Sequence, residues 1–223
     1  MMDLTVKDLV LRSPSGRRLL DIPALAVPAG GVLAIAGRSG AGKSTLLFAV
    51  AGLTPVTAGS VTWGAKRLSA LTEDDRTAFR REAVGMVFQD NMLFEELSAA
   101  ENAALGALYA PRPTRGSVKE AASAALGAFG LAGADTRRAE SYSGGERQRI
   151  AVARALSTDP AIVLADEPTA SLDRATADAL IADLMSNARD RGRTLVVASH
   201  DPALLSAADK VVTLEDGRLA SDG

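Results

Sequence analysis

The sequence of 223 residues predicts an α/β fold in which helices cover a mostly parallel β-sheet. Two observations carry this prediction. Short runs that are apolar throughout, such as Val32–Ala36 and residues 161–165, are typical of strands buried on both faces of a parallel sheet. Helix-like segments separate the last three strand-like runs, so strands and helices alternate along that part of the chain.

The first elements predict β structure that precedes this main sheet. Residues 4–6 and 9–11 carry strand-like apolar positions and lead into a turn at residues 13–16. A further run at residues 25–27 ends at the Pro-Ala-Gly-Gly of residues 28–31. Val32–Ala36 then leads through a glycine-rich turn into an expected helix, residues 43–51. The other expected strands are residues 61–63, 84–88, 161–165, 194–199 and 210–214.

The strand pattern disappears between residues 91 and 141. This part is rich in alanine and has helical spacing at residues 99–108 and 118–129. The Ala-Pro-Arg-Pro of residues 110–113 separates the two helical stretches. The pattern indicates a helical insert within one α/β domain.

Composition narrows the function classes. The chain has 25 basic and 27 acidic residues and a net charge of −2, so we expect no nucleic-acid partner. The absence of cysteine excludes disulfides and cysteine-ligated zinc, and is consistent with a reducing cytosol. We expect no signal peptide, and the longest apolar stretch, residues 46–53, is far shorter than the ~20 residues that span a bilayer. We therefore expect the isolated chain to be soluble.

A phosphate-binding loop follows the first buried strand. The segment GRSGAGKST matches G-x-x-x-x-G-K-[ST], and it lies between a strand and a helix as that motif requires. Backbone N–H groups of such a loop surround phosphate oxygens, and the helix N-terminus adds partial positive charge. Lys43 would reach the β- and γ-phosphates, and the Ser44 hydroxyl would ligate Mg²⁺. The expected binding residues are Gly37, Arg38, Ser39, Gly40, Ala41, Gly42, Lys43, Ser44 and Thr45.

Two later strands end in candidate catalytic residues. Asp166 and Glu167 follow residues 161–165, at the strand end where ligands bind in parallel sheets. Asp166 would hold Mg²⁺, and Glu167 would orient or deprotonate an attacking water. Such an acidic strand end is as often merely solvated, but a phosphate-binding loop in the same chain favours function. His200, the only histidine, follows residues 194–199 and would reach the γ-phosphate from the same edge, although a lone histidine is more often structural.

The segment YSGGERQR poses a separate question. Two glycines follow Ser143 and begin a helix, although each glycine costs about 1 kcal/mol relative to alanine. A serine cap alone does not need them. The pattern indicates that another group comes close to this backbone.

The ordered set GRSGAGKST, Phe88-Gln89, YSGGERQR, ADEP, Ser171-Leu172-Asp173 and His200 resembles the nucleotide-binding subunit of ATP-binding-cassette (ABC) transporters. The resemblance covers nearly the whole chain. It implies the ABC-ATPase fold of the P-loop NTPases, with an N-terminal antiparallel β part and an α-helical subdomain. It also implies a single domain, residues 1–223, in which residues 1–90 and 146–223 form a RecA-like core with the β part. Residues 91–145 would form the helical subdomain that ends in the signature motif, YSGGERQR.

The resemblance implies that the chain binds ATP and Mg²⁺, and that its signature motif contacts a second copy of the chain. Two copies would pack head to tail, so that Ser143, Gly144, Gly145 and Glu146 of one copy meet the ATP held by the other copy's phosphate-binding loop. Asp173 would cross this interface. Gln89 would contact Mg²⁺ and the attacking water, so the implied catalytic set is Glu167, His200 and Gln89, and the metal set is Ser44, Gln89 and Asp166.

Three departures from the family pattern stand out. Tyr142 replaces a commoner leucine, and Glu146 replaces a frequent glutamine. No aromatic residue lies near Ser13 or Pro14, where family members place the ring that stacks on adenine. We therefore assign no adenine-stacking residue.

The expected function is an ATPase subunit that drives a separate membrane permease, docked on the helical subdomain, from the cytoplasmic face of the inner membrane. SGGERQR followed by ADEPT is similar to the branch that serves lipoprotein release, macrolide export and cell division. Ala170–Asp173 departs from that branch, so an importer of a small solute stays an alternative. A cassette in DNA repair or translation would carry coiled-coil, zinc-binding or duplicated parts, and a small-molecule kinase leaves YSGGERQR unexplained.

Overall fold

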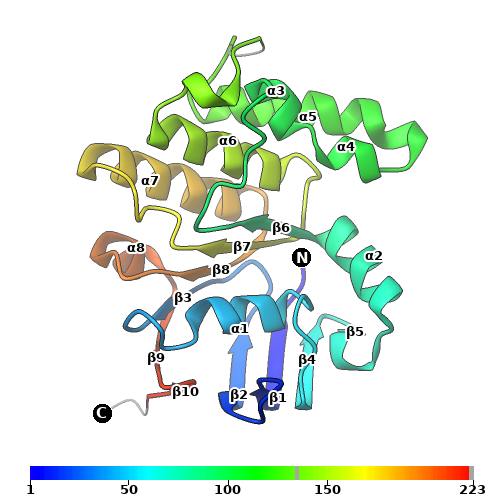
Figure 1. The fold of residues 1–223 in the computed structure, drawn as a ribbon, viewed down its shortest axis with the longest axis vertical. Helices are drawn as coiled ribbons and strands as arrows, with labels where there is room; N and C mark the ends of the chain where they lie inside the picture. Colours follow the sequence, from blue (N-terminus) through cyan, green and yellow to red (C-terminus); the bar gives the residue numbers. More distant parts are fainter. Residues whose placement is uncertain (134–135, 221–223) are drawn as a thin grey trace.

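The computed structural model describes residues 1–133 and 136–220, and it has two β-sheets and a helical layer (Figure 1). The expected ranges 91–145 and 146–223 each include a few residues outside those described. One sheet has four strands in the order β2-β1-β4-β5, and the other has six in the order β10-β9-β3-β8-β7-β6. The predicted fold class, a mostly parallel sheet with an N-terminal antiparallel part and a helical part, is confirmed.

The four-stranded sheet is antiparallel and forms from the N-terminal third of the chain. β1 (Leu4–Arg12) pairs with β2 (Arg18–Val27) and with β4 (Ala58–Trp63), and β4 pairs with β5 (Lys66–Arg67). The expected strand-like residues 4–6 and 9–11 lie in one strand, β1, and the expected run 25–27 is the end of the longer β2. Asp8 takes a positive φ of 47°, which lets one strand face keep Leu4, Val6, Leu9 and Leu11 in the core.

The six-stranded sheet is parallel from β9 to β6. Its strands are β3 (Val32–Ala36), β6 (Val84–Val87), β7 (Ile162–Asp166), β8 (Thr194–Ala198) and β9 (Lys210–Glu215), and only β10 (Arg218–Leu219) is antiparallel. All residues of β7 and β8 are buried, which accounts for their continuous apolar sequence.

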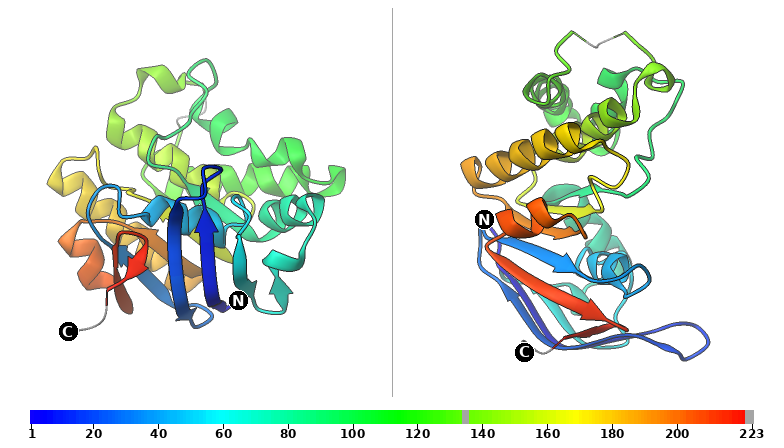
Figure 2. Two further views of the ribbon diagram at one scale, coloured as in Figure 1. Left: turned by 60° about the horizontal axis from the view of Figure 1, so that its bottom comes forward. Right: turned by 90° about the vertical axis from the view of Figure 1, so that its left-hand side faces the viewer.

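Helices cover both faces of this sheet. α1 (Lys43–Val50) lies between the two sheets and shares its core with them, while α7 (Arg174–Asp190) and α8 (Pro202–Ala207) pack on the opposite face. The two views of Figure 2 show the antiparallel sheet stacked against one face of the parallel sheet. Among the described residues, no helix is both long enough and apolar enough to cross a bilayer.

The helical layer stands beyond β6 and β7 and is made of α3 (Ala99–Ala103), α4 (Gly106–Tyr109), α5 (Arg115–Ala128) and α6 (Gly144–Leu156), with two 3₁₀ turns, Arg112–Thr114 and Ala139–Ser141. No strand occurs among the described residues of 91–141, although a single bridge joins Ser98 to Arg138. The expected helix 99–108 is interrupted after Ala103. A side chain at Gly106, the first residue of α4, would lie 2.8 Å from Cγ2 of Thr158, so this helix packs closely against the segment after α6.

The sequence analysis did not predict α2 (Glu73–Ala83). Only Phe79 and Ala83 of this helix are buried, so its apolar pattern is weak. Residues at its two ends favour the helix instead, because Thr72 caps the N-terminus and Arg80 and Arg81 lie in the last turn. A short 3₁₀ turn, Leu68–Ala70, leads into it.

Candidate functional site

Four neighbouring parallel strands deliver the candidate residues to one edge of the sheet. The phosphate-binding loop follows β3, His200 follows β8, Asp166 and Glu167 end β7, and Gln89 follows β6. Since the strands are adjacent in the order β3-β8-β7-β6, residues far apart in sequence meet at the carboxyl edge, where ligands bind in such sheets.

The loop Gly37–Thr45 has a backbone that only glycine adopts easily. Gly37, Gly40 and Gly42 have φ values of 146°, 80° and 103°. A side chain at Gly37 would also collide with the carbonyl oxygen of Leu214. Gly42 is the N-cap residue of α1, so the backbone amides in the first turn of this helix face the loop.

Lys43 lies across its own loop and is only 8% exposed. Its Nζ donates to the carbonyl oxygens of Gly37 at 2.8 Å and Arg38 at 3.3 Å, and it forms an ion pair with Oε1 of Glu167 at 3.1 Å. The other carboxylate oxygen of Glu167 lies 2.9 Å from Nδ1 of His200. The structure thus brings the predicted lysine, carboxylate and histidine into one chain of contacts.

The backbone of Glu167 is strained. Its φ of 44° is unusual for a residue with a side chain, and such values concentrate at functional sites. The amide of Glu167 donates to the carbonyl oxygen of Ala198, which fixes the peptide to β8. The carboxylate is therefore aimed by a backbone that the two strands hold.

Asp166 has the features of a metal ligand. It is 4% exposed, and within the described part of the chain its Oδ1 has no hydrogen-bond partner. Burial raises the pKa of Asp166, repulsion from Glu167 adds to the rise, and a hydrogen bond with Ser44 and the charge of Lys43 oppose it. A buried carboxylate oxygen without a partner, next to a serine hydroxyl, fits a hard cation such as Mg²⁺.

A cavity of about 610 Å³ collects most of these groups. Every residue of the loop Gly37–Thr45 except Ala41 lines it, together with Gln89, Glu167, Ala170 and His200. Ala41 instead accepts a hydrogen bond from the amide of Gly217. The size and polarity of the cavity suit the phosphate groups of a nucleotide.

The signature motif lies outside this cavity. None of Ser143, Gly144, Gly145, Glu146 and Asp173, all of them described residues, lines it. Gly144 lines a separate cavity of about 290 Å³ between α6 and the core, which Gln89 and Glu167 also border. The structure therefore brings Gln89, Glu167 and His200 to the loop and leaves the signature residues beside it.

Ser143 caps α6 through a capping box. Its hydroxyl oxygen accepts from the amide of Glu146 at 3.3 Å, and Oε2 of Glu146 accepts from the amide of Ser143 at 2.8 Å. The hydrogen bond from that amide lowers the pKa of Glu146. The Ser143 hydroxyl also hydrogen-bonds the Glu146 carboxylate, which lowers the same pKa.

The two signature glycines differ in their surroundings. A side chain at Gly145 would lie 2.8 Å from Cγ2 of Thr176 and 3.5 Å from Leu172, so packing against α7 excludes it. A side chain at Gly144 would meet nothing closer than the carbonyl oxygen of Ser171 at 4.0 Å. Contacts within this chain therefore explain Gly145 and do not explain Gly144.

Asp173 caps α7 in a similar way. Its carboxylate accepts from the amide of Thr176 at 3.0 Å and from the hydroxyl of Thr176 at 2.6 Å, which lowers the pKa of Asp173. Thr176 thus hydrogen-bonds Asp173 and also packs beside Gly145. The N-termini of α6 and α7 therefore lie close together at this threonine.

Two arginines of α6 that the sequence analysis did not single out hold the segment after Gln89. Arg154 donates to the carbonyl oxygens of Asn91 at 2.7 Å and Met92 at 2.6 Å, and Arg147 forms an ion pair with Glu95 at 3.0 Å. Burial lowers the pKa of Arg154. The seven-residue spacing of these arginines places them on one helix face. This spacing was the feature of the sequence from which a shared role could have been predicted.

Comparison with known proteins gives consistent relatives. Residues 20–170 match the model of the family described as ABC transporter. Rv0986 of Mycobacterium tuberculosis, named as an uncharacterized ABC transporter ATP-binding protein, is 40% identical over 207 residues, covering 91% of this chain and 82% of the relative. LolD of Gluconobacter oxydans, named as a lipoprotein-releasing system ATP-binding protein, is 40% identical over 222 residues, covering 97% and 94%.

Solved structures agree in fold. A dimeric post-hydrolysis state of the ATP-binding cassette MJ0796, bound to ADP and Pi, superposes with a TM-score of 0.88 at 29% identity and covers 99% of this chain and 97% of that one. CbiO1 of Clostridium perfringens, described as part of the ABC transporter complex cbiONQ, gives 0.86 at 27% identity, with coverage of 99% and 87%.

Proposed function

The chain belongs to the ABC transporter family as an ATP-binding and ATP-hydrolysing subunit, and on this premise we propose how its residues divide the work. The loop Gly37–Thr45 binds the phosphates of ATP through its amides and Lys43. Ser44, Asp166 and Gln89 would hold Mg²⁺, which would neutralise phosphate charge.

Glu167 acts as the base that orients and deprotonates the attacking water, and His200 and Gln89 align the γ-phosphate and that water. The ion pair between Lys43 and Glu167 supports this assignment. A γ-phosphate on Lys43 takes the place of the Glu167 carboxylate. The carboxylate, still next to His200, is then free to accept a proton.

The signature motif acts on a second copy of the chain. The observation that carries this proposal is the open side of Gly144 beside the capped Ser143, at a helix N-terminus outside the chain's own phosphate cavity. Ser143 donates to the γ-phosphate held by the partner copy, Gly144 lets that phosphate approach, and Glu146 and Asp173 set the helix ends at the interface. Each ATP is thereby bound between two copies, which form a head-to-tail dimer.

A complementation experiment tests the composite site. A Lys43→Ala chain and a Ser143→Arg chain, each inactive alone, are mixed with ATP and Mg²⁺. In a head-to-tail heterodimer, the intact loop of the Ser143→Arg chain faces the intact signature of the Lys43→Ala chain. We expect the mixture to regain up to about half of the per-dimer wild-type ATPase rate when heterodimers predominate.

The control for this mixture is a chain that carries both substitutions, mixed with either single variant. Neither mixture contains a complete composite site, so both stay inactive. If the two single variants together show no more ATPase activity than either alone while heterodimers form, the composite site is wrong.

We further propose that residues 91–145 form a helical subdomain on which an integral membrane permease docks, and that residues 1–90 and 146–223 form the core. Exposed apolar side chains on this layer support the docking, since Met92, Phe94, Leu108 and Tyr109 are all more than half exposed. The chain would then lie peripherally on the cytoplasmic face of the inner membrane. The relatives named LolD support a role in export or force transmission over solute import.

A further inference from the structure

We propose that an ion pair between Arg174 and Asp201 positions His200 and makes its position depend on the segment that meets the partner copy. Both are positioning residues, because neither of these described residues lines the phosphate cavity. The inference rests on the proposed function, in which His200 aligns the γ-phosphate and Asp173 lies at the dimer interface. It adds a connection between these two places within one chain.

The side chain of His200 is held by little packing. It is 72% exposed, and its Nδ1 lies 2.9 Å from Oε2 of Glu167. A side chain that is so exposed takes its position mainly from the backbone that carries it. The turn after β8 therefore decides where the imidazole ring lies.

Asp201, the next residue, fixes that turn. Its side chain is only 11% exposed, and it caps α8 by accepting from the amide of Ala203 at 2.9 Å. The amide of Asp201 donates to Oγ of Ser199 at 3.1 Å. The carboxylate also accepts from Nη1 of Arg174, with both oxygens at 3.1 Å, and from the hydroxyl of Thr169 at 3.3 Å. The turn is thereby joined to the segment that follows β7.

Arg174 begins α7 and directly follows Asp173. Its guanidinium group pairs with Asp201 on one side and with Asp178, on the next turn of α7, on the other. The N-terminus of α7 also packs against the signature motif. One arginine therefore connects the helix end at the proposed interface to the turn that carries His200.

This pair has more effect on position than on stability. Arg174 is 54% exposed, and exposed ion pairs contribute little to the stability of a fold. A shift of the α7 N-terminus, when a partner copy binds there, displaces Arg174 and with it the turn next to His200. Because a small misplacement of an aligning group slows a reaction that depends on positioning, dimerisation controls the rate through this pair.

Steady-state ATPase assays of single variants test the pair. Asp201→Asn keeps a residue that caps helices well and removes the charge that pairs with Arg174. We expect Arg174→Ala and Asp201→Asn each to lower kcat about tenfold and to change the KM for ATP by less than about twofold. The control, Asp178→Asn, removes the other partner of the same arginine and should leave kcat within about twofold of the wild type.

Further variants separate positioning from a general loss of structure. The double variant of Arg174→Ala and Asp201→Asn should lose no more activity than either single variant, because both remove the same contact. Arg174→Lys should recover part of kcat. The inference is overturned by equal losses in Asp178→Asn and Asp201→Asn, by losses that multiply in the double variant, or by a fall in melting temperature that accounts for the fall in kcat.

NMR spectroscopy reports on His200 directly. It is the only histidine of the chain, so the untagged protein gives one set of imidazole signals. We expect Arg174→Ala and Asp201→Asn to shift these ¹H–¹³C signals and Asp178→Asn to leave them in place. Unshifted signals in the first two variants overturn the inference and leave the ATPase function intact, whereas failure of the wild-type chain to bind ATP overturns the proposed function instead.

Discussion

At the scale of single residues, the site is defined by what each side chain or missing side chain contacts. Gly144 and Gly145 are adjacent and identical in sequence, yet α7 excludes a side chain only at Gly145. Asp166 and Glu167 are also adjacent. Among the described residues Oδ1 of Asp166 has no hydrogen-bond partner, whereas Glu167 contacts both Lys43 and His200. Neighbouring residues therefore have separable roles.

The two glycines make a matched pair of substitutions. We expect Gly145→Ala to lower the unfolding free energy by about 1–3 kcal/mol, because the added methyl group overpacks against Thr176. Adding Thr176→Ser removes the clashing methyl and restores most of the loss. Gly144→Ala should fold normally and impair ATP-dependent dimerisation, as measured by denaturant unfolding and by size-exclusion chromatography.

Two results would contradict this division. One is a Gly144→Ala chain that is as unstable as Gly145→Ala. The other is a Gly145→Ala chain whose stability is the same with Thr176 and with Ser at that position.

Asp166 predicts a dependence of stability on pH. Because burial raises the pKa of Asp166, the folded chain binds this proton more tightly than the unfolded chain, and the ionised carboxylate destabilises the fold at neutral pH. We expect Asp166→Asn to melt a few degrees higher than the wild type at pH 7 without Mg²⁺. The difference should shrink as the pH falls below the ordinary Asp pKa of about 3.9, where the carboxyl is protonated in both states.

The same variant should gain less stability from Mg²⁺ and ATP than the wild type gains. Differential scanning calorimetry across pH measures both effects. An Asp166→Asn chain that melts lower than the wild type at pH 7 without Mg²⁺ would show that burial of the charge is not the dominant effect.

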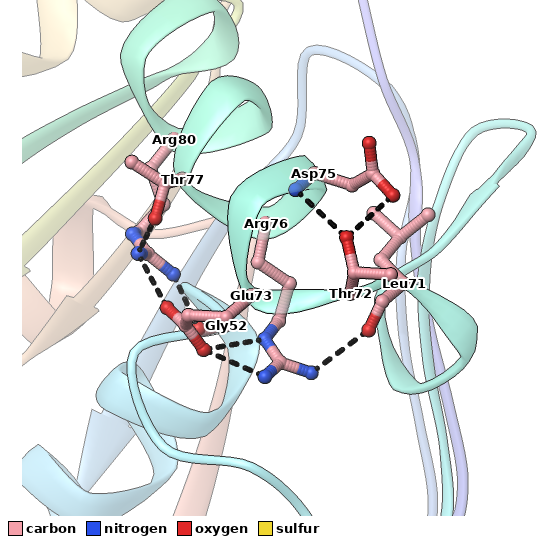
Figure 3. Close-up of polar contacts among 8 residues, drawn as sticks. All are labelled: Gly52, Leu71, Thr72, Glu73, Asp75, Arg76, Thr77 and Arg80. Carbon is pink, nitrogen blue, oxygen red and sulfur yellow. Dashed lines mark hydrogen bonds and ion pairs between the residues drawn. The ribbon is translucent and has the colours of Figure 1, made fainter.

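At the scale of elements, α2 shows how a helix forms from its ends. Glu73 accepts from Arg76 and Arg80, Arg76 donates to the carbonyl oxygen of Leu71, and Arg80 donates to that of Gly52 at 2.5 Å (Figure 3). Gly52 follows the phosphate-loop helix α1, so Arg80 supplies positive charge at the C-terminal end of that helix. The network joins α2 to the end of α1.

Arg80 and Arg81 test this contact as neighbours on one helix. We expect Arg80→Ala to lower the unfolding free energy by about 1–2 kcal/mol, since it removes a charged donor from the Gly52 carbonyl. Arg81 forms an exposed ion pair with Glu82 at 3.6 Å, so Arg81→Ala should stay within about 0.5 kcal/mol of the wild type. Urea unfolding measures both, and equal losses in the two variants would exclude the Gly52 contact as the cause.

The elements also show what the sequence could reveal. Buried parallel strands are short apolar runs, so β3, β7 and β8 and the site residues that follow them were predictable. α2 buries too few apolar residues to leave a periodic signal, and the close packing of Gly106 against Thr158 joins residues that are distant in sequence. The contact of Lys43 with Glu167 depends on strand order, which the sequence does not show directly.

At the scale of the whole molecule, the strand order collects the catalytic groups on one edge while the helical layer places the signature motif beside them. Arg154 and Arg147 connect α6 to the segment after Gln89. A movement of the layer therefore displaces both the signature motif and the residues next to Gln89. If a permease docks on the layer as proposed, this arrangement would couple it to both parts of the proposed composite site.

The whole-molecule prediction concerns the dimer. We expect Glu167→Gln to retain ATP binding, to lose ATPase activity by about 10²-fold or more, and to form a stable dimer with ATP. The dimer accumulates because bound ATP joins the copies and is not hydrolysed. Light scattering with ATP and with ADP measures it, and the Lys43→Ala chain, which should stay monomeric in both, is the control.

If the Glu167→Gln chain hydrolyses ATP at the wild-type rate, Glu167 is not the base. If it stays monomeric with ATP, even in the presence of its membrane permease, the proposed composite site is wrong.

The pairing of Lys43 with Glu167 has one more consequence, for the binding of anions. Any anion that binds Lys43 must first displace this carboxylate, so part of the anion's binding free energy is offset by breaking the internal pair.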